Sequence, residues 1–209
     1  MKKSTLTLRK LVSSNSFANF AFAVGLYEVH NSAFNGFFLT ELGHDFLKLY
    51  YKSVSTAHDG ILIGAYHDDR LIGFCAACTE CSGFNTRLIK NNIIRFCITG
   101  LKLLFTRPKA LMRLSKNLTK KGEVNDDGHY AELMSIAVDR EIQNSGAGKA
   151  MMNFLERILQ QRNVGKLSLT TDKLNNENTL AFYEKRGFRQ MYVFTAYPDR
   201  IMYRLIKDI

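Results

Sequence analysis

The stretch YAELMSIAVDREIQNSGAGKAMMNFLERI, residues 130–158, decides how this chain folds. Its first part, 130–138, alternates in the way that is typical of a strand. One face would carry Tyr130, Glu132, Met134, Ile136 and Val138, and the other Ala131, Leu133, Ser135 and Ala137. From Ala147 onward the apolar residues recur at helical spacing instead. The stretch therefore predicts a strand, a polar loop, and a helix that opens directly from that loop.

The loop between these two elements, 143–148, carries two glycines and is predicted to bind an anion. Free backbone N–H groups at the start of a helix, together with the helix dipole, favour a ligand such as a pyrophosphate. Asn144 tolerates the left-handed backbone of such loops, and Lys149 either adds a cation or is a solvated lysine. The alternative interpretation of the loop is a tight turn without a ligand.

The rest of the sequence predicts further strands and helices around this centre. Upstream, the periodicity predicts a strand over 5–11, a helical segment to about 27, an amphipathic helix from Leu39, and a hairpin of strands over 61–66 and 70–78. Downstream, it predicts a strand over 166–171, a short helix over 177–186 that Asn175 and Asn176 cap and Gly187 ends, and two strands over 188–197 and 200–206. The segment 84–121 has mostly helical spacing, broken at Pro108.

Composition and charge narrow the class of protein. The chain has 209 residues, of which 46% are hydrophobic, enough for one buried core, which excludes a disordered chain. Lys and Arg number 29 against 19 Asp and Glu, and ten of the cations lie in 81–122, where no acidic residue occurs. The remainder of the chain is therefore neutral, and the excess charge concerns partners of that one segment.

The cysteines do not predict a metal site. Three of them follow the pattern C-x-x-C-x-x-C at positions 75, 78 and 81, but a strand would place Cys75 and Cys78 on opposite faces. We interpret them as small buried hydrophobic residues in a reducing compartment. No stretch is apolar enough to span a membrane, because Arg95 and Lys102 interrupt the best candidate. The expected location is cytoplasmic.

Three features together resemble the GNAT superfamily of acetyl-CoA-dependent N-acetyltransferases. They are the pattern Gln-x-x-Gly-x-Gly over 143–148, the run from Asn178 through Ala181 and Tyr183 to EKRGF at 184–188, and the strand ELMSIAVD at 132–139 ahead of the loop. The motifs cover about residues 130–190. The resemblance implies an α/β fold with a mixed, mostly antiparallel sheet of about seven strands, a V-shaped splay and helices on both faces. It further implies a single domain over 1–209. The basic helical segment at about 84–122 is an insertion into that domain, which relatives do not ordinarily carry.

The resemblance implies acetyl-CoA as co-substrate and no metal. In this family the strand before the loop separates from its neighbour, and its free backbone groups pair with the pantetheine arm like an added strand. Those groups would belong here to Ile136, Ala137 and Val138. The implied cofactor-binding residues are Ile136, Ala137, Val138, Gln143, Asn144, Ser145, Gly146, Ala147, Gly148, Lys149, Asn178 and Tyr183.

Two residues are implied to act in catalysis. Tyr183 holds the position that in this family donates a proton to the departing thiolate, and its alternative is a packed aromatic. Glu132 stands where some relatives place a general base that acts directly or through water, and its alternative is a strand glutamate paired with a cation. A backbone N–H, such as that of Ile136, would stabilise the developing oxyanion. Aromatic residues that would neighbour the acceptor are Phe34, Phe37, Phe38, Tyr192 and Tyr197.

The predicted function is transfer of acetyl from acetyl-CoA to the primary amine of a small molecule, with an amino sugar, nucleotide-linked or lipid-linked, preferred. The alternatives are acetylation of a protein or an aminoacyl-tRNA, and a non-catalytic acetyl-CoA-binding protein. Four interpretations of the basic insertion stay open. It could bind the anionic inner surface of the membrane, an acidic soluble acceptor, or a nucleic acid. Alternatively, it is a solvated helical hairpin that only covers the sheet edge or forms a homodimer.

Overall fold

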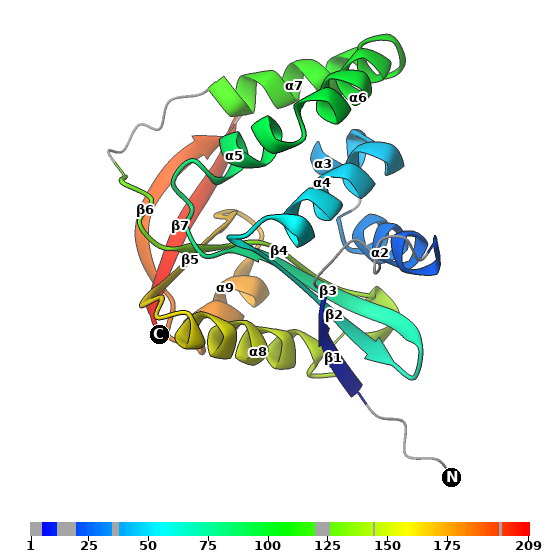
Figure 1. Cartoon of the computed structure of the whole chain (residues 1–209). Coiled ribbons are helices and arrows are strands. Elements are labelled where there is room, and N and C mark those ends of the chain that lie inside the picture. The colour runs from blue at the N-terminus through cyan, green and yellow to red at the C-terminus, as the bar shows by residue number, and fades with distance from the viewer. Residues whose placement is uncertain (1–5, 12–19, 35–37, 120–125, 144, 197) are drawn as a thin grey trace.

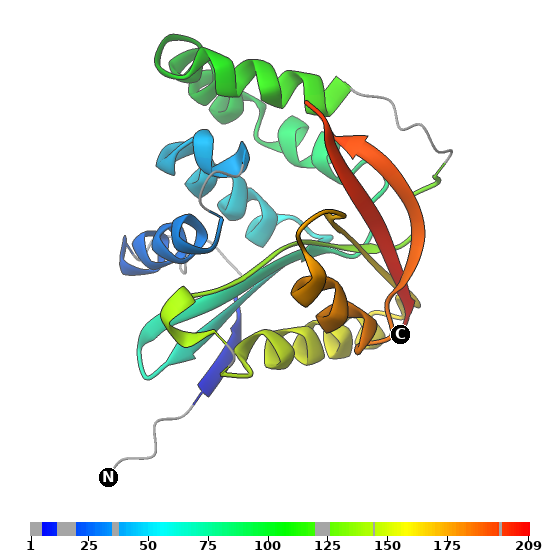
Figure 2. The same cartoon turned by 180° about the vertical axis from the view of Figure 1, so that it is seen from behind.

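The computed structural model of the chain describes residues 6–11, 20–34, 38–119, 126–143, 145–196 and 198–209. Its strands form one seven-stranded sheet in the order β1-β2-β3-β4-β5-β7-β6, with helices on both faces (Figures 1 and 2). The strands are β1 (Leu6–Lys10), β2 (Gly60–His67), β3 (Arg70–Cys78), β4 (Ala131–Val138), β5 (Lys166–Asp172), β6 (Arg189–Ala196) and β7 (Arg200–Asp208). Only the β4–β5 pair is parallel among them. The predicted fold class is confirmed.

Two hydrophobic layers hold the helices against the sheet. On one face, α8 (Ala147–Gln161) and α9 (Glu177–Glu184) pack with Ile63, Cys75 and Leu133. On the other face, α2 (Phe20–Ala33) and α4 (His44–Thr56) pack with residues such as Phe74 and Cys78. Cys75 and Cys78 thus lie on opposite faces, as the strand pattern predicts.

The helix predicted from Leu39 onward is divided in two, which corrects the sequence-based expectation. A short helix, α3 (Phe38–Glu41), is followed by Leu42 and Gly43 before α4 begins. Gly43 has φ of 83°, a left-handed conformation that an α-helix cannot contain. The apolar spacing runs through this break, so the periodicity alone does not reveal it.

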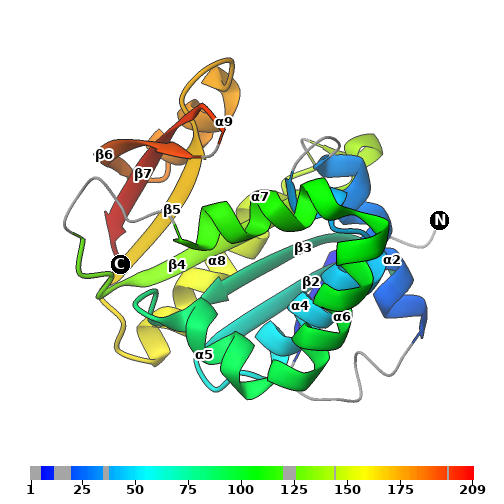
Figure 3. The same ribbon diagram turned by 90° about the horizontal axis from the view of Figure 1, so that it is seen from above.

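The basic segment forms three helices where the periodicity predicts two. They are α5 (Phe84–Asn91), α6 (Ile93–Thr106) and α7 (Pro108–Thr119), and the last begins at Pro108, a position that proline favours. The view from above, in Figure 3, shows α6 and α7 lying side by side over the α4 side of the sheet. A small cluster fixes them there, formed by Leu42, Phe46, Leu103 and Ala110. None of the described helices is long and apolar enough to cross a membrane.

A β-bulge in β4 corrects the alternation expected for that strand. Ala76 of β3 pairs with Ser135 and Ala77 pairs with Leu133, so Met134 is the extra residue. Beyond the bulge the faces exchange. Ile136 and Val138 pack on the α8 side with Leu133, whereas Ala137 packs on the α2 side.

The two strands β4 and β5 pair over three residue pairs only: Ala131 with Leu167, Glu132 with Ser168, and Leu133 with Leu169. Beyond these pairs β4 stays with β3 and β5 stays with β7. Figure 3 shows the two strands meeting at one end and diverging toward the other. This divergence is the predicted V-shaped splay, and it begins at the bulge.

Candidate active site

The splay opens into a cavity of about 810 Å³ between the two halves of the sheet. Its walls come from β4, β5, the start of α8, the first turns of α9, and the C-terminal part of α2. Most residues predicted to bind a cofactor line it: Ile136, Ala137, Val138, Gln143, Ser145, Gly146, Ala147, Gly148, Lys149, Asn178 and Tyr183. Asn144 lies outside the described residues. Segments that are far apart in the sequence therefore meet at one place.

The β4 edge presents free backbone groups to this cavity. The N–H of Asp139 donates to Ile72 O on the β3 side at 2.8 Å. Because successive residues of a strand point their backbone groups in opposite directions, those of Val138 and Ile136 face the splay. Ala137 lines the cavity, but its backbone carbonyl points away from it, toward β3. The carbonyl oxygen lies so close to Gly73 of β3 that a Cβ added to this glycine would be 2.9 Å from it.

The β5 edge is arranged in the same way on the opposite side. Lys173 N–H donates to Ile201 O at 2.9 Å, so Lys173 faces the strand next to β5. Alternation then turns the backbone groups of Asp172 and Thr170 toward β4. Two strand edges with unpaired groups thus face each other across the cavity, an arrangement that accepts an extended chain between them.

The start of α8 provides an anion site at one end of the cavity. Gly146 caps the helix with φ of 86°, and no atom lies within 4 Å of where its Cβ would be. The N–H groups of Gly148 and Lys149 belong to the first helical turn and have no partner within the helix. The fifteen-residue helix directs its positive dipole end here, and no acidic side chain lies in its first turn.

Tyr183 is buried at the cavity wall, on α9. Its ring packs edge-on against Phe182 and Phe188, at centroid distances of 5.3 and 5.5 Å, and the side chain is only 6% exposed. Burial raises the pKa of this phenol, so the hydroxyl keeps its proton at neutral pH. Gly187, with φ of 85°, ends this turn, and Phe188 N–H donates to Tyr183 O at 3.1 Å. A fixed, protonated phenol therefore lies at the cavity wall.

Glu132 is held by partners on the opposite face of the sheet from α8. One carboxylate oxygen accepts a hydrogen bond from Arg204 Nη1 at 2.6 Å, and the other accepts from Cys81 Sγ at 3.0 Å. Both side chains of the ion pair are mostly buried, at 17% and 14% exposed. Glu132 does not line the cavity, although its neighbour Leu133 does.

His30 is a cavity residue that the sequence analysis missed. Its Nδ1 lies 3.0 Å from the hydroxyl of Tyr51, which donates to Ser135 Oγ at 3.3 Å. The Nε2 atom is buried and has no partner among the described residues. Burial lowers the pKa of His30 from 6.5 to about 4, so the ring is neutral at physiological pH. Its position on α2, far from the motifs, gave no sequence signal.

The buried His30 predicts a pH-dependent stability. The unfolded chain binds a proton at this residue below pH 6.5, whereas the folded chain does so only near pH 4. Lowering the pH from 7 to 4 is therefore expected to remove about 3 kcal/mol of unfolding free energy through this group. Urea unfolding at several pH values measures it. The variant His30→Gln should have a flatter profile in this window, and identical slopes would contradict the assignment.

Polar residues at the end of β5 form a second group that the sequence analysis missed. Asp172 and Arg200 make a two-pronged ion pair, with nitrogen–oxygen distances of 2.6 and 3.0 Å, and both line the cavity. Asn176 fixes the start of α9, because its Nδ2 donates to Thr171 Oγ1 at 2.7 Å and to Asp172 O at 2.8 Å. Asp172 ends β5 and Arg200 begins β7, and single charged residues at strand ends carry no periodicity, so only the structure brings them together.

The aromatic residues expected near the acceptor are not all brought together. Phe34 lines the cavity. Tyr192 does not, since its hydroxyl donates to Asp126 at 2.5 Å beside Arg204. Phe37 and Tyr197 lie outside the described residues, as does the side chain of Phe38.

The residues present fit an elongated ligand with an anionic group at one end. Strand edges with free backbone groups suit an amide-bearing arm, and the helix start with open space above Gly146 suits a phosphate. Among the described residues, no cluster of three or more histidine, cysteine or acidic side chains is placed to hold a metal ion.

Comparisons with known proteins agree with this geometry. Over 78 residues the chain is 33% identical to the uncharacterized protein YxbD of Bacillus subtilis (strain 168). This match covers 32% of the present chain and 48% of YxbD, so the chain spans about half the length of that relative. The fold resembles the ribosomal-protein-S18-alanine N-acetyltransferase of Escherichia coli, with TM-score 0.60, 16% identity, and coverage of 98% and 94% of the two chains. PaiA N-acetyltransferase of Thermoplasma acidophilum, solved with coenzyme A, gives TM-score 0.57, 13% identity, and coverage of 98% and 99%.

The family assignment rests on a match that covers most of the chain. The model of the acetyltransferase (GNAT) family matches residues 23–188, which contain the splay, the α8 loop and α9. The chain belongs to the GNAT family of acetyltransferases.

Proposed function

We propose that this protein transfers an acetyl group from acetyl-CoA to a primary amine. The observation that carries the proposal is the pair of facing strand edges, which run from the start of α8 toward Tyr183. When bound, acetyl-CoA supplies an activated thioester acyl group. The protein then has to bind and orient it, stabilise a developing oxyanion, and move two protons.

Binding is assigned to backbone groups and a few side chains. Ile136 and Val138 hold the pantetheine arm as an added strand, and the amides of 143–149 with the Lys149 ammonium hold the pyrophosphate. Asn178 lines the cavity near the end of this path.

Catalysis is assigned to three groups of this chain. The N–H of Ile136 faces the splay and stabilises the oxyanion, and the protonated Tyr183 hydroxyl gives its proton to the thiolate. Glu132, the base that the sequence predicts, does not line the cavity and holds its carboxylate against Arg204 and Cys81, so it would accept the proton of the amine only through water. His30, a neutral ring on the wall, is the alternative base.

The preferred acceptor is the amine of a small polar molecule such as an amino sugar, nucleotide-linked or lipid-linked. The cavity wall supports this choice, because the polar residues Thr170 and Thr171 line it together with the Asp172–Arg200 pair. Such groups match a ligand rich in hydroxyls. The Escherichia coli relative in fold acetylates a protein alanine, so a peptide amine belongs among the candidates tested.

The test is release of free coenzyme A thiol from acetyl-CoA with a panel of amines. The panel contains amino sugars, nucleotide-linked amino sugars, peptides with a free N-terminus, and an aminoacyl-tRNA. Turnover with one class identifies the acceptor. Saturable binding of acetyl-CoA without turnover on any amine would leave a non-catalytic binding protein as the function.

The base assignment predicts the behaviour of Glu132→Gln. If Glu132 is the base, kcat is expected to fall about 100-fold, because the amide can no longer accept the proton of the amine. Rates are compared with His30→Gln under the same conditions. A loss of kcat of about 100-fold in His30→Gln, with Glu132→Gln near wild type, would transfer the role to His30 and leave Glu132 as an ion-pair residue.

A further inference from the structure

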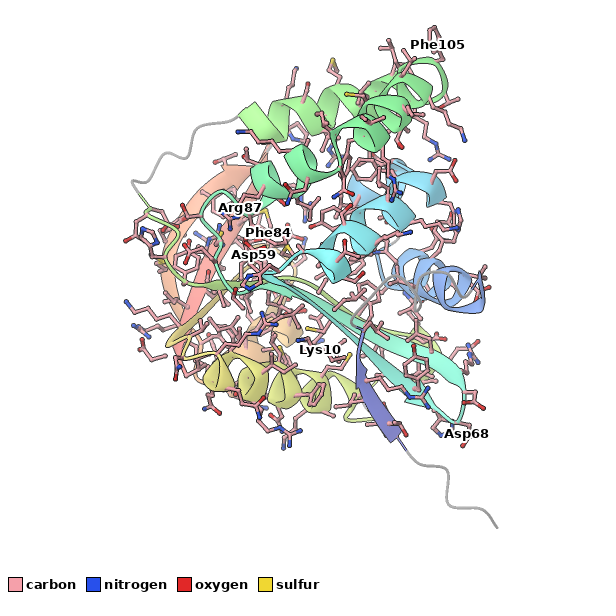
Figure 4. All side chains as sticks on the ribbon, in the orientation of Figure 1. Lys10, Asp59, Asp68, Phe84, Arg87 and Phe105 are labelled. Atoms are coloured by element: carbon pink, nitrogen blue, oxygen red, sulfur yellow. The ribbon has the colours of Figure 1, made fainter. Side chains whose placement is uncertain are left out.

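The outer face of α6 exposes a continuous apolar stripe. Its four side chains recur at helical spacing and are more than half exposed: Ile94 at 73%, Ile98 at 66%, Leu101 at 60% and Phe105 at 78%. Figure 4 shows Phe105 at the outer end of the helix, pointing away from the body of the protein. Exposed large hydrophobics normally occur singly, so a stripe of this kind marks an interaction surface.

The opposite face of α6 is firmly packed, which fixes the direction of the stripe. Leu103 is 5% exposed in the cluster with Phe46, and Phe96 packs edge-on against the Phe46 ring at 6.1 Å. At the end of the helix, Arg107 Nη1 donates to Glu41 O at 2.7 Å. A helix that is anchored on one side cannot turn its stripe inward without losing these contacts.

Cations surround the stripe. Arg95 lies on the same helix, and exposed Lys109 and Lys116 lie on the outer side of α7 with half-exposed Met112. Some cations of the segment serve the fold, such as Arg113, which pairs with Glu41 at 3.2 Å. No acidic residue occurs from 81 to 122. Asp45 and Glu41 of the adjoining helices pair with Lys102 and Arg113, and the other cations leave this segment with an excess of positive charge.

We infer that the outer face of α6 and α7, defined by Ile94, Ile98, Leu101, Phe105, Arg95 and Lys109, docks on an anionic phospholipid bilayer. A helix of this pattern lies in the plane of the interface, with its apolar side chains among the acyl chains and its cations at the headgroups. A second copy of the chain fits less well, because it would bring two positive surfaces together. A nucleic acid would satisfy the cations but would leave the aliphatic stripe in water.

The experiment is co-sedimentation of the full-length protein with vesicles. One set contains phosphatidylcholine alone, and the other contains phosphatidylcholine with phosphatidylglycerol. Wild type is expected to bind the anionic vesicles and to bind the neutral ones at least tenfold more weakly. The double variant Ile98→Ser with Phe105→Ser is expected to lose about 100-fold in partition coefficient, because two exposed apolar side chains no longer insert.

The charge variants give a second, independent measurement. Arg95→Gln and Lys109→Gln are each expected to weaken binding to anionic vesicles about fivefold, and high salt should reduce wild-type binding in the same direction. Matched controls outside the surface are Leu174→Ser, at an exposed apolar position, and Lys166→Glu, at an exposed cation. Both controls are expected to bind vesicles like wild type, and far-UV circular dichroism verifies the fold of every variant.

Three outcomes would overturn the inference. The first is no binding of wild type to anionic vesicles. The second is a wild-type dimer in sedimentation velocity that the Ile98→Ser, Phe105→Ser variant converts to a monomer without any vesicle binding. The third is salt-dependent RNA binding that the charge variants lose and the apolar variant keeps. None of these outcomes bears on acetyl transfer, so the proposed function stands or fails separately.

Discussion

Replacing Tyr183 with phenylalanine is expected to lower kcat by about 10²- to 10⁴-fold, the range for loss of a positioned proton donor. The ring of Tyr183 packs against Phe182 and Phe188, and phenylalanine preserves that packing. Only the hydroxyl disappears, and burial keeps that hydroxyl protonated in the wild type. The affinity for acetyl-CoA and the melting temperature should therefore change little.

Steady-state kinetics with the best amine of the panel, together with calorimetric titration of acetyl-CoA, provide the measurement. Tyr66→Phe is the matched control, because Tyr66 lies on β2 and does not line the cavity. The control should keep wild-type kcat. A kcat of Tyr183→Phe within twofold of wild type would remove this residue from the chemistry and make it a packing residue.

Replacing Gly146 with glutamate is expected to weaken acetyl-CoA binding by about 100-fold or more. Two effects act together. The φ of 86° at Gly146 is unfavourable for any residue with a Cβ, by about 1–2 kcal/mol. A carboxylate at the start of α8 also occupies the anion site and repels the pyrophosphate. Space is not the reason, since no atom lies within 4 Å of the position of the added Cβ.

Calorimetric titration of acetyl-CoA into both proteins measures this effect. Gly165→Glu is a matched control, because Gly165 also has open space around its Cβ position but lies outside the cavity and without a positive φ. The control is expected to bind like wild type. Equal affinities for Gly146→Glu and wild type would show that the helix start does not hold the pyrophosphate, and the proposed orientation of the cofactor would be wrong.

Much of the fold follows from local sequence. The alternation over 130–138 predicts the strand before the α8 loop, and the positive φ at Gly146 and Gly187 marks two places where one residue type decides the backbone. The periodicity fails where tertiary contacts decide. The helix breaks at Gly43 although the apolar spacing of the sequence continues through that position. The bulge at Met134 exchanges the faces of β4, and nothing in the residue types of the strand indicates it.

The candidate site divides along the same line. Residues on the α8 loop and on β4 could be predicted to line the cavity, because they are contiguous in the sequence. His30, Asp172 and Arg200 could not, since each comes from a different element and carries no motif. For Glu132, the sequence could predict an ion pair with a nearby cation but could not say which one. The structure shows that the cation is Arg204 of β7, a strand distant in the sequence.

If acetyl-CoA binds between the two strand edges as proposed, the short parallel junction of the sheet makes it part of the scaffold as well. Three residue pairs join the two halves of the sheet, and past them each half ends in an open edge. A ligand that bonds to both edges completes the sheet and stabilises the folded state by about 2.7 kcal/mol at a concentration 100-fold above its dissociation constant. Unfolded chains are the substrates of cellular proteases. The abundance of this protein should therefore follow the supply of acetyl-CoA, falling by degradation when the metabolite runs low.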